Sequence, residues 1–389
     1  MKQKNEKQRA DGAGAEERER DRAIAETLCA WFEKSARDLP WRQKKRDPYA
    51  VWLSEVMLQQ TRVDTVVPYF ERFLKRFPDA SSLAQASLDE VLHLWSGLGY
   101  YRRARELHAA AGEVVRRYGG ALPEEASELR TLPGIGPYTA GAIASMAFGK
   151  VEPLVDGNVS RVLARLFGVD EDIRSSAGSK KMWSIAARLV PRDKPGQFNE
   201  ALMEFGATVC TPKDPHCLLC PARHLCSAFE EGKQLELPVV GEKASVPRVA
   251  MISLVLWHGA DVLFARRSEG GLFGGMWEPP MIAAASLEEA LCGLRDLGLE
   301  LGHHPFEEVG EVRHLLTHRE LFVKVAAARA NERFDSIELN QNPYERVSWL
   351  SPGALKGGVS TLALKVLEAG KTPGFKAKAS ASAKKRGQS

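Results

Sequence analysis

The chain has 389 residues and a mass of 42.9 kDa, more than one ordinary hydrophobic core holds, so two domains are expected. Its apolar content of 44% and charged content of 27% are typical of soluble globular proteins. No apolar run reaches the roughly 18 residues that cross a bilayer. The charged N-terminal segment lacks the apolar centre of a secretory signal, so the sequence argues against a membrane or secreted protein.

The net charge of +4 comes from one end of the chain. Residues 371–389 hold six basic and no acidic side chains, and the rest of the chain has 48 basic against 50 acidic residues. A nucleic-acid surface on the folded part must therefore be a local patch. The 371–389 tail is predicted to be disordered; weak attraction to phosphate and the absence of any role both stay open for it.

The first two thirds of the chain read as helical. Residues 1–22 are predicted to form a flexible arm and residues 23–231 an all-α domain, because apolar residues recur there at three- and four-residue spacing between Gly and Pro breaks. Helices are expected at 51–61, 87–95, 103–118, 138–148 and 158–167. Ser87 and Glu90 form a capping-box pair, which supports the start of the second of these.

A change of composition predicts a second domain. Residues 232–247 contain two prolines and are interpreted as a linker, followed by an α+β domain over residues 248–370. Strands are expected at 249–257, 262–265, 321–325 and 347–350, and helices at 286–297 and 361–369. Ser286 and Glu289 form a second capping-box pair at the first of these helices.

Four of the six cysteines crowd into 17 residues with the spacing C-x6-C-x2-C-x5-C. They are Cys210, Cys217, Cys220 and Cys226. This is not a secreted disulfide framework, and it lacks the two separated C-x2-C knuckles of zinc ribbons. Buried free thiols are a plausible reading for Cys29 and Cys292 but not for these four. The spacing is similar to the [4Fe–4S] loop of the endonuclease III and MutY glycosylase superfamily, which implies such a cluster in a structural and DNA-contacting role.

A Gly-rich turn, Leu132–Gly136, lies between two helical patterns. Gly134 and Gly136 permit a tight turn, and the following helix offers free N–H groups, so the segment can hold a phosphate without reading sequence. As a bare pattern it fits any helix–turn–helix. Followed by PYTAGAIASMAFG, it resembles the helix–hairpin–helix of the same superfamily.

Two carboxylates stand out by their surroundings. Glu55, in VWLSEVMLQQT, has apolar neighbours on a helix, and burial would raise its pKa until it held a proton near neutrality. Asp156, in LVDGNVSRV, falls at a helix start, where backbone N–H groups favour the ionised form. One acid and one anion suit the breaking of a glycosidic bond. From the residues alone, a solvated glutamate and an ordinary N-cap aspartate remain open.

Motif order gives the closest resemblance. SEVMLQQT, GLGYY, LPGIGPYTAG, LVDGNVSRV and FNEALMEFGA, followed by the cysteines, resemble MutY-type adenine glycosylases from about Trp31 to Cys226. The resemblance implies excision of adenine paired with 8-oxoguanine or guanine in double-stranded DNA. Glu55 would protonate adenine and Asp156 would stabilise the sugar cation or a covalent intermediate, with Tyr138 and Asn158 as supporting partners.

The residue at position 138 predicts the reaction subtype. Relatives such as endonuclease III carry a lysine there, whose amine attacks the sugar and leads to strand cleavage. A phenol cannot form that Schiff base, so Tyr138 predicts base excision without efficient lyase activity.

A base inside a duplex must be extruded before chemistry, and another group must fill the gap. Gln59, Gln60, Tyr100 and Tyr101 have suitable side chains, and the residues alone rank the two tyrosines equally. The resemblance implies that Gln60 and Tyr100 are the inserted pair. It also places Arg42 and Glu200 in the adenine pocket, where a surface arginine and a solvated glutamate are the alternatives.

The C-terminal domain resembles the Nudix fold of the 8-oxoguanine triphosphatase, chiefly through GGLFGGMWEPP. The Nudix Arg-Glu-x-x-Glu-Glu helix is replaced by SLEEALCGLRDLG, so a binding module is expected instead of a second hydrolase. In RHLLTHREL, the family's Phe-Ser-His becomes Leu316-Thr317-His318, which implies that Thr317 and His318 contact 8-oxoguanine. A histidine-rich surface turn is the alternative.

Two other readings compete with this one. One is another enzyme of the superfamily, such as a thymine-mismatch glycosylase or an endonuclease III-like lyase; the other is a non-catalytic DNA-binding iron–sulfur protein or redox carrier. The absence of a targeting signal leads us to expect a bacterial cytoplasm, and we expect a monomer.

Overall fold

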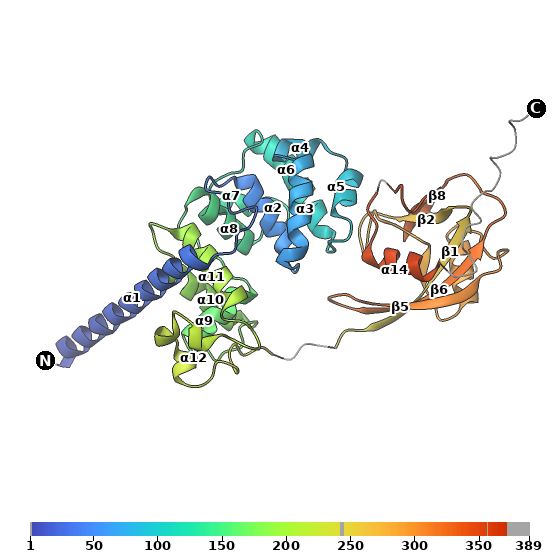
Figure 1. Cartoon of the computed structure of the whole chain (residues 1–389). Coiled ribbons are helices and arrows are strands. Elements are labelled where there is room, and N and C mark those ends of the chain that lie inside the picture. The colour runs from blue at the N-terminus through green and yellow to red at the C-terminus, as the bar shows by residue number, and fades with distance from the viewer. Residues whose placement is uncertain (1, 242–244, 356, 372–389) are drawn as a thin grey trace, which may run out of the picture. The chain divides into compact units, whose positions relative to one another are not determined.

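The computed structural model describes residues 2–241, 245–355 and 357–371, coloured along the chain in Figure 1. The fold divides into two compact units. A helical unit takes Met1–Gln85 and Glu106–Lys243, and a sheet unit takes Ala86–Arg105 and Ala244–Ser389. The short segment Ala86–Arg105 thus belongs to the sheet unit, although it lies in the middle of the sequence predicted to be one helical domain. In the described part of the chain, no helix is both long and apolar enough to cross a membrane.

The helical unit contains most of the helices. They are α1 (Lys2–Ser35), α2 (Pro48–Leu58), α3 (Val63–Arg76), α4 (Ala80–Gln85), α6 (Arg102–Tyr118, from Glu106 onward), α7 (Ala126–Leu129), α8 (Pro137–Phe148), α9 (Gly157–Leu166), α10 (Ser176–Leu189), α11 (Pro195–Thr208) and α12 (Ser227–Glu230), with 3-10 turns η1 (Cys217–Leu219) and η2 (Arg223–Leu225). Helix α8 packs against α2, α7 and α11, and α11 also packs against α1 and α9. Because α8 is apolar on all sides, it forms the centre of this unit.

Local signals fix the helix ends that matter for the site. Asp47 caps α2 by accepting from the Tyr49 N–H, and Asp156 caps α9 by accepting from the Val159 N–H. On α8, a Cβ at Gly141 would lie 2.1 Å from the carbonyl oxygen of Pro153. Glycine is needed there because the backbone leading to Asp156 passes directly against α8.

The N-terminal prediction needs correction. Helix α1 begins at Lys2, whereas the sequence predicts a flexible arm over residues 1–22. This segment has no proline and is rich in helix-forming Glu, Lys, Arg and Ala, so the helix continues through it. The Arg20 guanidinium donates to the carbonyls of Leu166 and Leu225, and Asp21 pairs with Arg188 at 2.6 Å. Residues 20–22 therefore belong to the folded unit.

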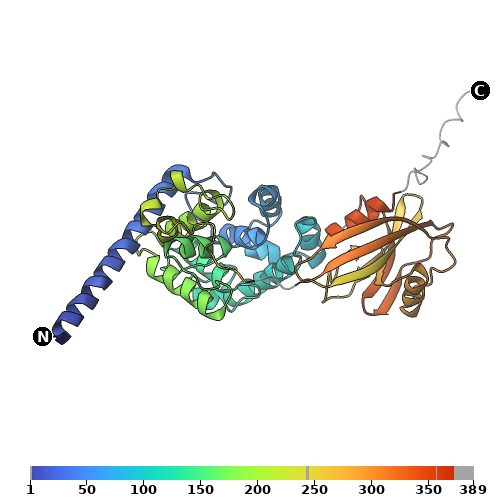
Figure 2. The ribbon, with the colours of Figure 1, turned by 90° about the horizontal axis from the view of Figure 1, so that it is seen from below.

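The sheet unit is built on one mixed sheet with helices on both faces (Figure 2). Its elements are α5 (Leu88–Trp95), β1 (Arg248–His258), β2 (Asp261–Arg267), β3 (Trp277–Glu278), β4 (Met281–Ala283), α13 (Leu287–Asp296), β5 (Glu307–Leu315), β6 (Glu320–Arg329), β7 (Ile337–Gln341), β8 (Tyr344–Leu350) and α14 (Thr361–Ala369). The strand order is β5-β6-β1-β2-β8-β7, with β3 beside β2 and β4 beside β1. Strands β1 and β6 are parallel, and the other pairs are antiparallel.

Side chains along β1 alternate between the two faces of the sheet, and each face has its own hydrophobic core. Leu254 and Leu256 point to the face covered by α13, whereas Val255 points to the face covered by α14. The predicted strands and helices of this unit are all present, but the short β3 and β4 and the strands β5 and β7 were missed. Strand β5 contains three glutamates and is largely exposed at the edge of the sheet, so it lacks the apolar alternation that sequence analysis detects. The predicted fold class, an all-α domain followed by an α+β domain, is confirmed. Residues 372–389 of the predicted tail lie outside the described residues.

Candidate active site

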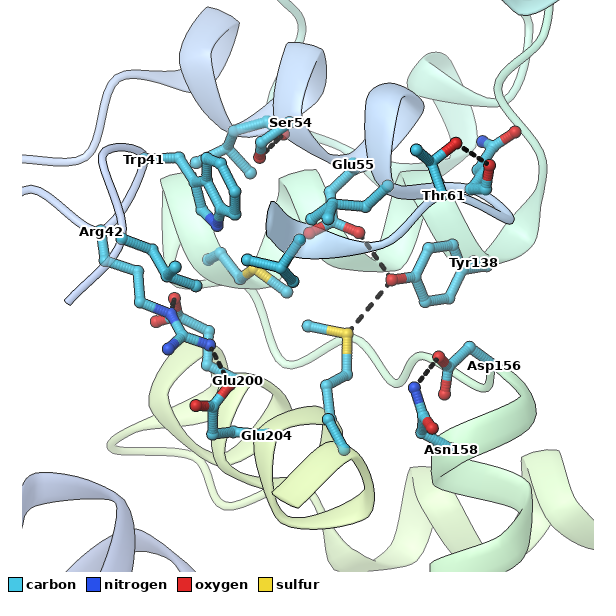
Figure 3. A pocket seen from close by; sticks show the side chains of 18 of the residues that line it. Trp41, Arg42, Ser54, Glu55, Thr61, Tyr138, Asp156, Asn158, Glu200 and Glu204 are labelled. Carbon is cyan, nitrogen blue, oxygen red and sulfur yellow. Dashed lines mark hydrogen bonds and ion pairs between the residues drawn. The ribbon is translucent and has the colours of Figure 1, made fainter. Parts of the chain in front are cut away.

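A cavity of about 450 Å³ opens in the helical unit, within the size range of small-ligand pockets. Figure 3 shows side chains from α2, α8, α9 and α11 around it, together with Trp41 and Arg42 from the segment before α2. The predicted site residues that line it are Arg42, Glu55, Gln60, Tyr138, Asp156, Asn158 and Glu200. Residues that are far apart in the sequence of the helical domain thus line one cavity. No lysine is among the described residues that line it.

Glu55 is the buried acid of this cavity. Its side chain comes from the middle of α2, is 4% exposed, and lies 2.6 Å from the Tyr138 hydroxyl, which donates to Oε2. Burial raises the pKa of Glu55 to about 7; the Tyr138 hydrogen bond lowers it and the nearby Asp156 charge raises it. Near neutral pH this carboxyl therefore retains a proton in a large share of molecules.

Asp156 lies in a different environment across the same cavity. Its Oδ1 accepts from the Val159 N–H at 2.7 Å and its Oδ2 accepts from Asn158 Nδ2 at 3.1 Å. Burial raises the pKa of Asp156, and these donors oppose that rise because they bind the charged form. Asp156 has backbone and amide donors that stabilise its charged form, whereas Glu55 lies in the middle of a helix among apolar groups. If the two carboxyl groups hold one proton between them, that proton therefore resides on Glu55.

The amide of Asn158 is oriented by an arginine that sequence analysis missed. Arg161, 8% exposed, donates to Asn158 Oδ1 at 2.8 Å, to the Gly206 carbonyl at 2.7 Å and to the Cys210 carbonyl at 2.8 Å. With its oxygen occupied, Asn158 must present its NH₂ group to Asp156. No sequence signal marks Arg161, because the Gly206 and Cys210 carbonyls that hold it lie more than forty residues along the chain.

Charged residues line another side of the cavity. Arg42 lies between two carboxylates on α11, with Nε 3.4 Å from Glu200 Oε1 and Nη2 3.0 Å from Glu204 Oε2. Arg46 donates to Glu200 at 2.6 Å. The predicted pair Arg42 and Glu200 is thus an ion pair at the cavity, and neither residue is the solvated surface group that the sequence left open.

Glu204 is a second missed residue of this network. It is 2% exposed and accepts from Arg37 Nε at 2.6 Å and Nη2 at 2.8 Å. Burial raises the pKa of Glu204, but hydrogen bonds from Arg37 and Arg42 outweigh it and hold the pKa at about 2. The signal available in the sequence was its spacing: Glu200 and Glu204 are four residues apart and share one face of α11.

The Gly-rich turn has the geometry of a tight hairpin into α8. Gly134 has φ +71°, and a Cβ there would meet Glu106 Cβ at 2.6 Å, so only glycine fits. Gly136 is the N-cap of α8, and no atom lies within 4 Å of a Cβ built on it. The backbone at the start of α8 therefore has open space on the side of Gly136, where an anion could approach the helix N-terminus.

The two predicted wedge residues share an unusual backbone. Gln60 has φ +57° and Tyr100 has φ +50°, in a region that costs non-glycine residues of the order of 1–2 kcal/mol. Both side chains are exposed. Helix α2 ends at Leu58, three residues before the predicted end, because the chain turns at Gln60. Tyr101 is 7% exposed, so the two tyrosines that the sequence ranked equally are separated into an exposed Tyr100 and a buried Tyr101.

The four clustered cysteines line one apolar cavity between α9, α11 and the 3-10 turns. Arg165 Nη1 lies 3.3 Å from Cys210 Sγ, which places a positive charge beside a potential thiolate. Among the described residues, no three Cys, His, Asp or Glu side chains gather tightly enough for a single metal ion. Separate cysteines around a shared space suit a polynuclear iron–sulfur centre, in which each iron takes its own thiolate.

Two family models match the chain. Residues 53–188 match the HhH-GPD superfamily of base excision DNA repair proteins, and residues 252–369 match a NUDIX domain. An adenine DNA glycosylase of the mouse, Mus musculus, is 37% identical over 390 residues, covering 85% of this chain and 73% of that protein. The chain belongs to the adenine DNA glycosylase family. This confirms the resemblance seen in the motifs.

Further members of the adenine DNA glycosylase family are similar over the same region. The protein of Buchnera aphidicola subsp. Acyrthosiphon pisum is 36% identical, covering 70% of this chain and 77% of that protein. Among solved structures, a thermostable thymine-DNA glycosylase aligns with a TM-score of 0.51 and 31% identity, covering 55% of this chain and 98% of that one. The thymine-DNA glycosylase therefore matches only about half of the chain.

In this adenine DNA glycosylase family member, the turn between β5 and β6 carries Thr317 and His318, both exposed. The turn is closed by the Leu316 N–H, which donates to the Arg319 carbonyl at 2.9 Å.

On α13, Glu289 Oε2 accepts from the Ala285 N–H at 2.8 Å. Of the two glutamates at the start of this helix, Glu289 is thus engaged in capping.

Proposed function

We propose that this chain is a monofunctional DNA glycosylase that excises adenine paired with 8-oxoguanine or guanine in double-stranded DNA. The observation that carries the proposal is that Glu55, with a pKa of about 7, and Asp156, held by amide and backbone donors, line one cavity. A base and its sugar that enter this cavity meet an acid and an anion together.

The reaction follows from these two groups. The glycosidic bond breaks with its electron pair passing to the adenine, and Glu55 delivers its proton to a ring nitrogen so that a neutral base leaves. Asp156 faces the cationic sugar, and Asn158, oriented by Arg161, donates to its carboxylate. A water molecule then adds to the sugar carbon and gives its proton to the Glu55 carboxylate, which restores the acid and leaves an abasic site.

Two observations support base excision without strand cleavage. The residue beside Glu55 is Tyr138, and the described residues that line the cavity include no lysine whose amine could attack the sugar. Borohydride trapping on adenine-containing duplex should therefore give little cross-linked protein. Heavy trapping would contradict the monofunctional assignment.

Recognition of the mispair is assigned to residues other than the Glu55–Asp156 pair. Backbone N–H groups of the Gly134–Gly136 turn and of the first turn of α8 after Pro137 would hold a phosphate. Gln60 and Tyr100 would enter the base stack, and Arg42 and Glu200 would contact the extruded adenine. Thr317 and His318 would contact the 8-oxoguanine. The protein would act as a monomer on duplex DNA.

The four clustered cysteines would hold a [4Fe–4S] cluster, which would tie the loop 210–226 to α9 and α11 and supply no chemistry to base release. Arg165 supports this assignment because its guanidinium donates to Cys210 Sγ and so fixes that sulfur at the edge of the cavity. The test is iron and sulfide content with visible absorbance of the purified protein. Cys220→Ser should lower all three, whereas Cys292→Ser, at an exposed cysteine outside the loop, should leave them unchanged.

The deciding experiment uses duplexes with one adenine opposite 8-oxoguanine, guanine or thymine, and a duplex with thymine opposite guanine. Free base and alkali-labile sites are scored under single-turnover conditions. Adenine release from the first two duplexes is expected, and Glu55→Gln should lower it by at least about 100-fold while retaining duplex binding. Release of thymine alone would assign the chain to a different glycosylase activity, and an unaffected Glu55→Gln protein would contradict the mechanism.

A further inference from the structure

The loop Ser96–Tyr101 joins α5 to α6 and presents Tyr100 to solvent. Three of its residues have positive φ: Gly97 at +94°, Gly99 at +76° and Tyr100 at +50°. A non-glycine residue keeps this conformation only where its surroundings hold it there. The contacts that hold this loop therefore decide where the Tyr100 ring points.

Both ends of the loop form hydrogen bonds to the same atom in the C-terminal part of the chain. The Ser96 hydroxyl and the Tyr101 hydroxyl each donate to the carbonyl oxygen of Val359 at 2.9 Å. One carbonyl oxygen has two lone pairs and can accept both. The Tyr101 oxygen also accepts from the Gly97 N–H at 3.2 Å, so this single hydroxyl connects the middle of the loop to Val359.

Val359 is itself rigidly placed in the sheet unit. It forms a β-bridge with Trp277, whose N–H donates to the Gly358 carbonyl at 2.9 Å. A Cβ at Gly358 would lie 2.8 Å from Leu92 Cβ, so α5 packs directly against this segment. Val359 is 5% exposed in the core on the α14 face, and Leu316, the neighbour of Thr317, packs against the same core.

Local contacts hold the Tyr100 ring within the loop. The Arg103 guanidinium lies over the Tyr100 ring at 5.2 Å and over the Trp95 ring at 5.5 Å. Arg103 Nη2 and Trp95 Nε1 both donate to the Gly99 carbonyl, at 3.2 and 3.1 Å. These contacts fix the ring relative to the loop, whereas the two hydroxyls fix the loop relative to Val359.

We infer that Tyr101 and Ser96 are positioning residues for Tyr100. Their hydroxyls anchor the loop on Val359, in the same packed unit that carries the Thr317–His318 turn, so that Tyr100 enters the duplex at a fixed place relative to that turn. The inference rests on the proposed function, in which Tyr100 occupies the gap beside the extruded adenine. Neither hydroxyl contacts the cavity around Glu55.

The test is a double-mutant cycle in the full-length protein. The paired change Ser96→Ala with Tyr101→Phe is made with and without Tyr100→Ala, and single-turnover adenine release is measured on the 8-oxoguanine duplex. Removing both anchors should slow release about tenfold when Tyr100 is present, as the loss of hydrogen bonds of ordinary strength predicts. In the Tyr100→Ala background the same change should cost less than about twofold, because the side chain being positioned is already gone.

A matched control removes another buried phenol oxygen of the sheet unit. The Tyr344 hydroxyl donates to Glu278 Oε1 at 2.8 Å, and its oxygen also hydrogen-bonds to the backbone of Met281, outside the loop. Tyr344→Phe should change the rate less than about twofold in both backgrounds. If the paired variant does not fold, Tyr101→Phe alone, which keeps the Ser96 bond, takes its place in the cycle.

Equal losses in both Tyr100 backgrounds would show that the hydroxyls act on stability alone and would overturn the inference, as would an unchanged rate. A second readout separates this failure from failure of the proposed function. With 2-aminopurine next to the mispair, Tyr100→Ala and the paired variant should both lose most of the fluorescence change on binding. This readout requires no base release; a wild-type protein that gives the fluorescence change but no free adenine would count against the proposed function only.

Discussion

The hydroxyl oxygen of Tyr138 lies 2.6 Å from Oε2 of Glu55 and 3.1 Å from the sulfur of Met203. The phenol thus gives the buried carboxyl a polar partner on a mostly apolar side of the cavity. Burial raises the pKa of Glu55 and this hydrogen bond limits the rise, so the two effects together set the value of about 7. Five predictions follow from this relationship and from the contacts of the neighbouring residues.

The rate of adenine release should fall as pH rises through about 7. Glu55 acts only while protonated, and its pKa is about 7 in the folded protein. The single-turnover rate should decline about tenfold per pH unit above that pH and be level below it, until the pH is low enough for Asp156, which acts as an anion, to take up a proton. A rate that increases through this range would show that the ionised carboxylate is the active form.

Removing the Tyr138 hydroxyl should shift the pH dependence of the release rate to higher pH. In Tyr138→Phe the hydrogen bond that lowers the pKa of Glu55 is lost, so the pKa rises and the decline begins at higher pH. The expected shift is measured on the same duplex from the pH at which the rate is half its maximum. A profile displaced to lower pH would contradict the role given to this hydrogen bond.

The same carboxyl should make stability depend on pH. Its pKa is about 7 when folded and near the ordinary glutamate value of 4.5 when unfolded, so the native state binds more protons between these values. The free energy of unfolding should therefore decrease as pH rises from about 4.5 to 7, by up to about 3 kcal/mol from this group. Glu55→Gln removes the effect, and its stability relative to wild type should rise between about pH 5 and pH 8 in denaturant unfolding. An unchanged difference would place Glu55 in a polar environment.

Gly206→Ala should impair the reaction through Asn158. A Cβ at this position would lie 2.8 Å from Asn158 Cβ and 3.1 Å from its carbonyl oxygen, so Asn158 must shift from the position in which it donates to Asp156. We expect release to slow by about tenfold or more, because small displacements of positioning groups are costly. Gly112→Ala on α6 is the control: no atom lies within 4 Å of its added Cβ, so the rate should be unchanged. Equal rates in the two variants would argue against a role for Asn158.

The turn between β5 and β6 should affect lesion preference and not chemistry. Thr317→Ala combined with His318→Ala removes two exposed polar groups without disturbing the core. The preference for adenine opposite 8-oxoguanine over adenine opposite guanine should decrease about tenfold. The rate at saturating protein on the guanine duplex should stay within about twofold, since neither residue lines the Glu55 cavity. An unchanged preference would remove this assignment.

Features that depend on neighbouring residues were predictable from the sequence. The N-caps at Ser87, Asp156 and Ser286 each accept the predicted backbone N–H, because the partners lie within three residues along the chain. The richness in β-forming residues that predicts β1 is likewise local, and so is the cysteine spacing. Strand β5 was not predicted because its place in the sheet depends on pairing with β6, not on apolar residues of its own.

The network of charged residues around the cavity was harder to predict from the sequence. Arg161, Glu204 and Arg37 are ordinary charged residues in the sequence, and only their buried partners mark them as part of the site. Tyr100 and Tyr101 are adjacent and chemically alike. Only the bond to Val359 and the difference in exposure distinguish them.

The sequence by itself determined which side chains are present and where helices begin, because these properties depend on residue type and on contacts a few positions apart. The tertiary structure alone decided that Glu55 and Asp156, about a hundred residues apart, line one cavity. It also decided the pKa of Glu55, since the raised value arises from burial by α8 and α11 and from the charge of Asp156. Burial and charge act through space, and the order of residues along the chain does not contain those distances.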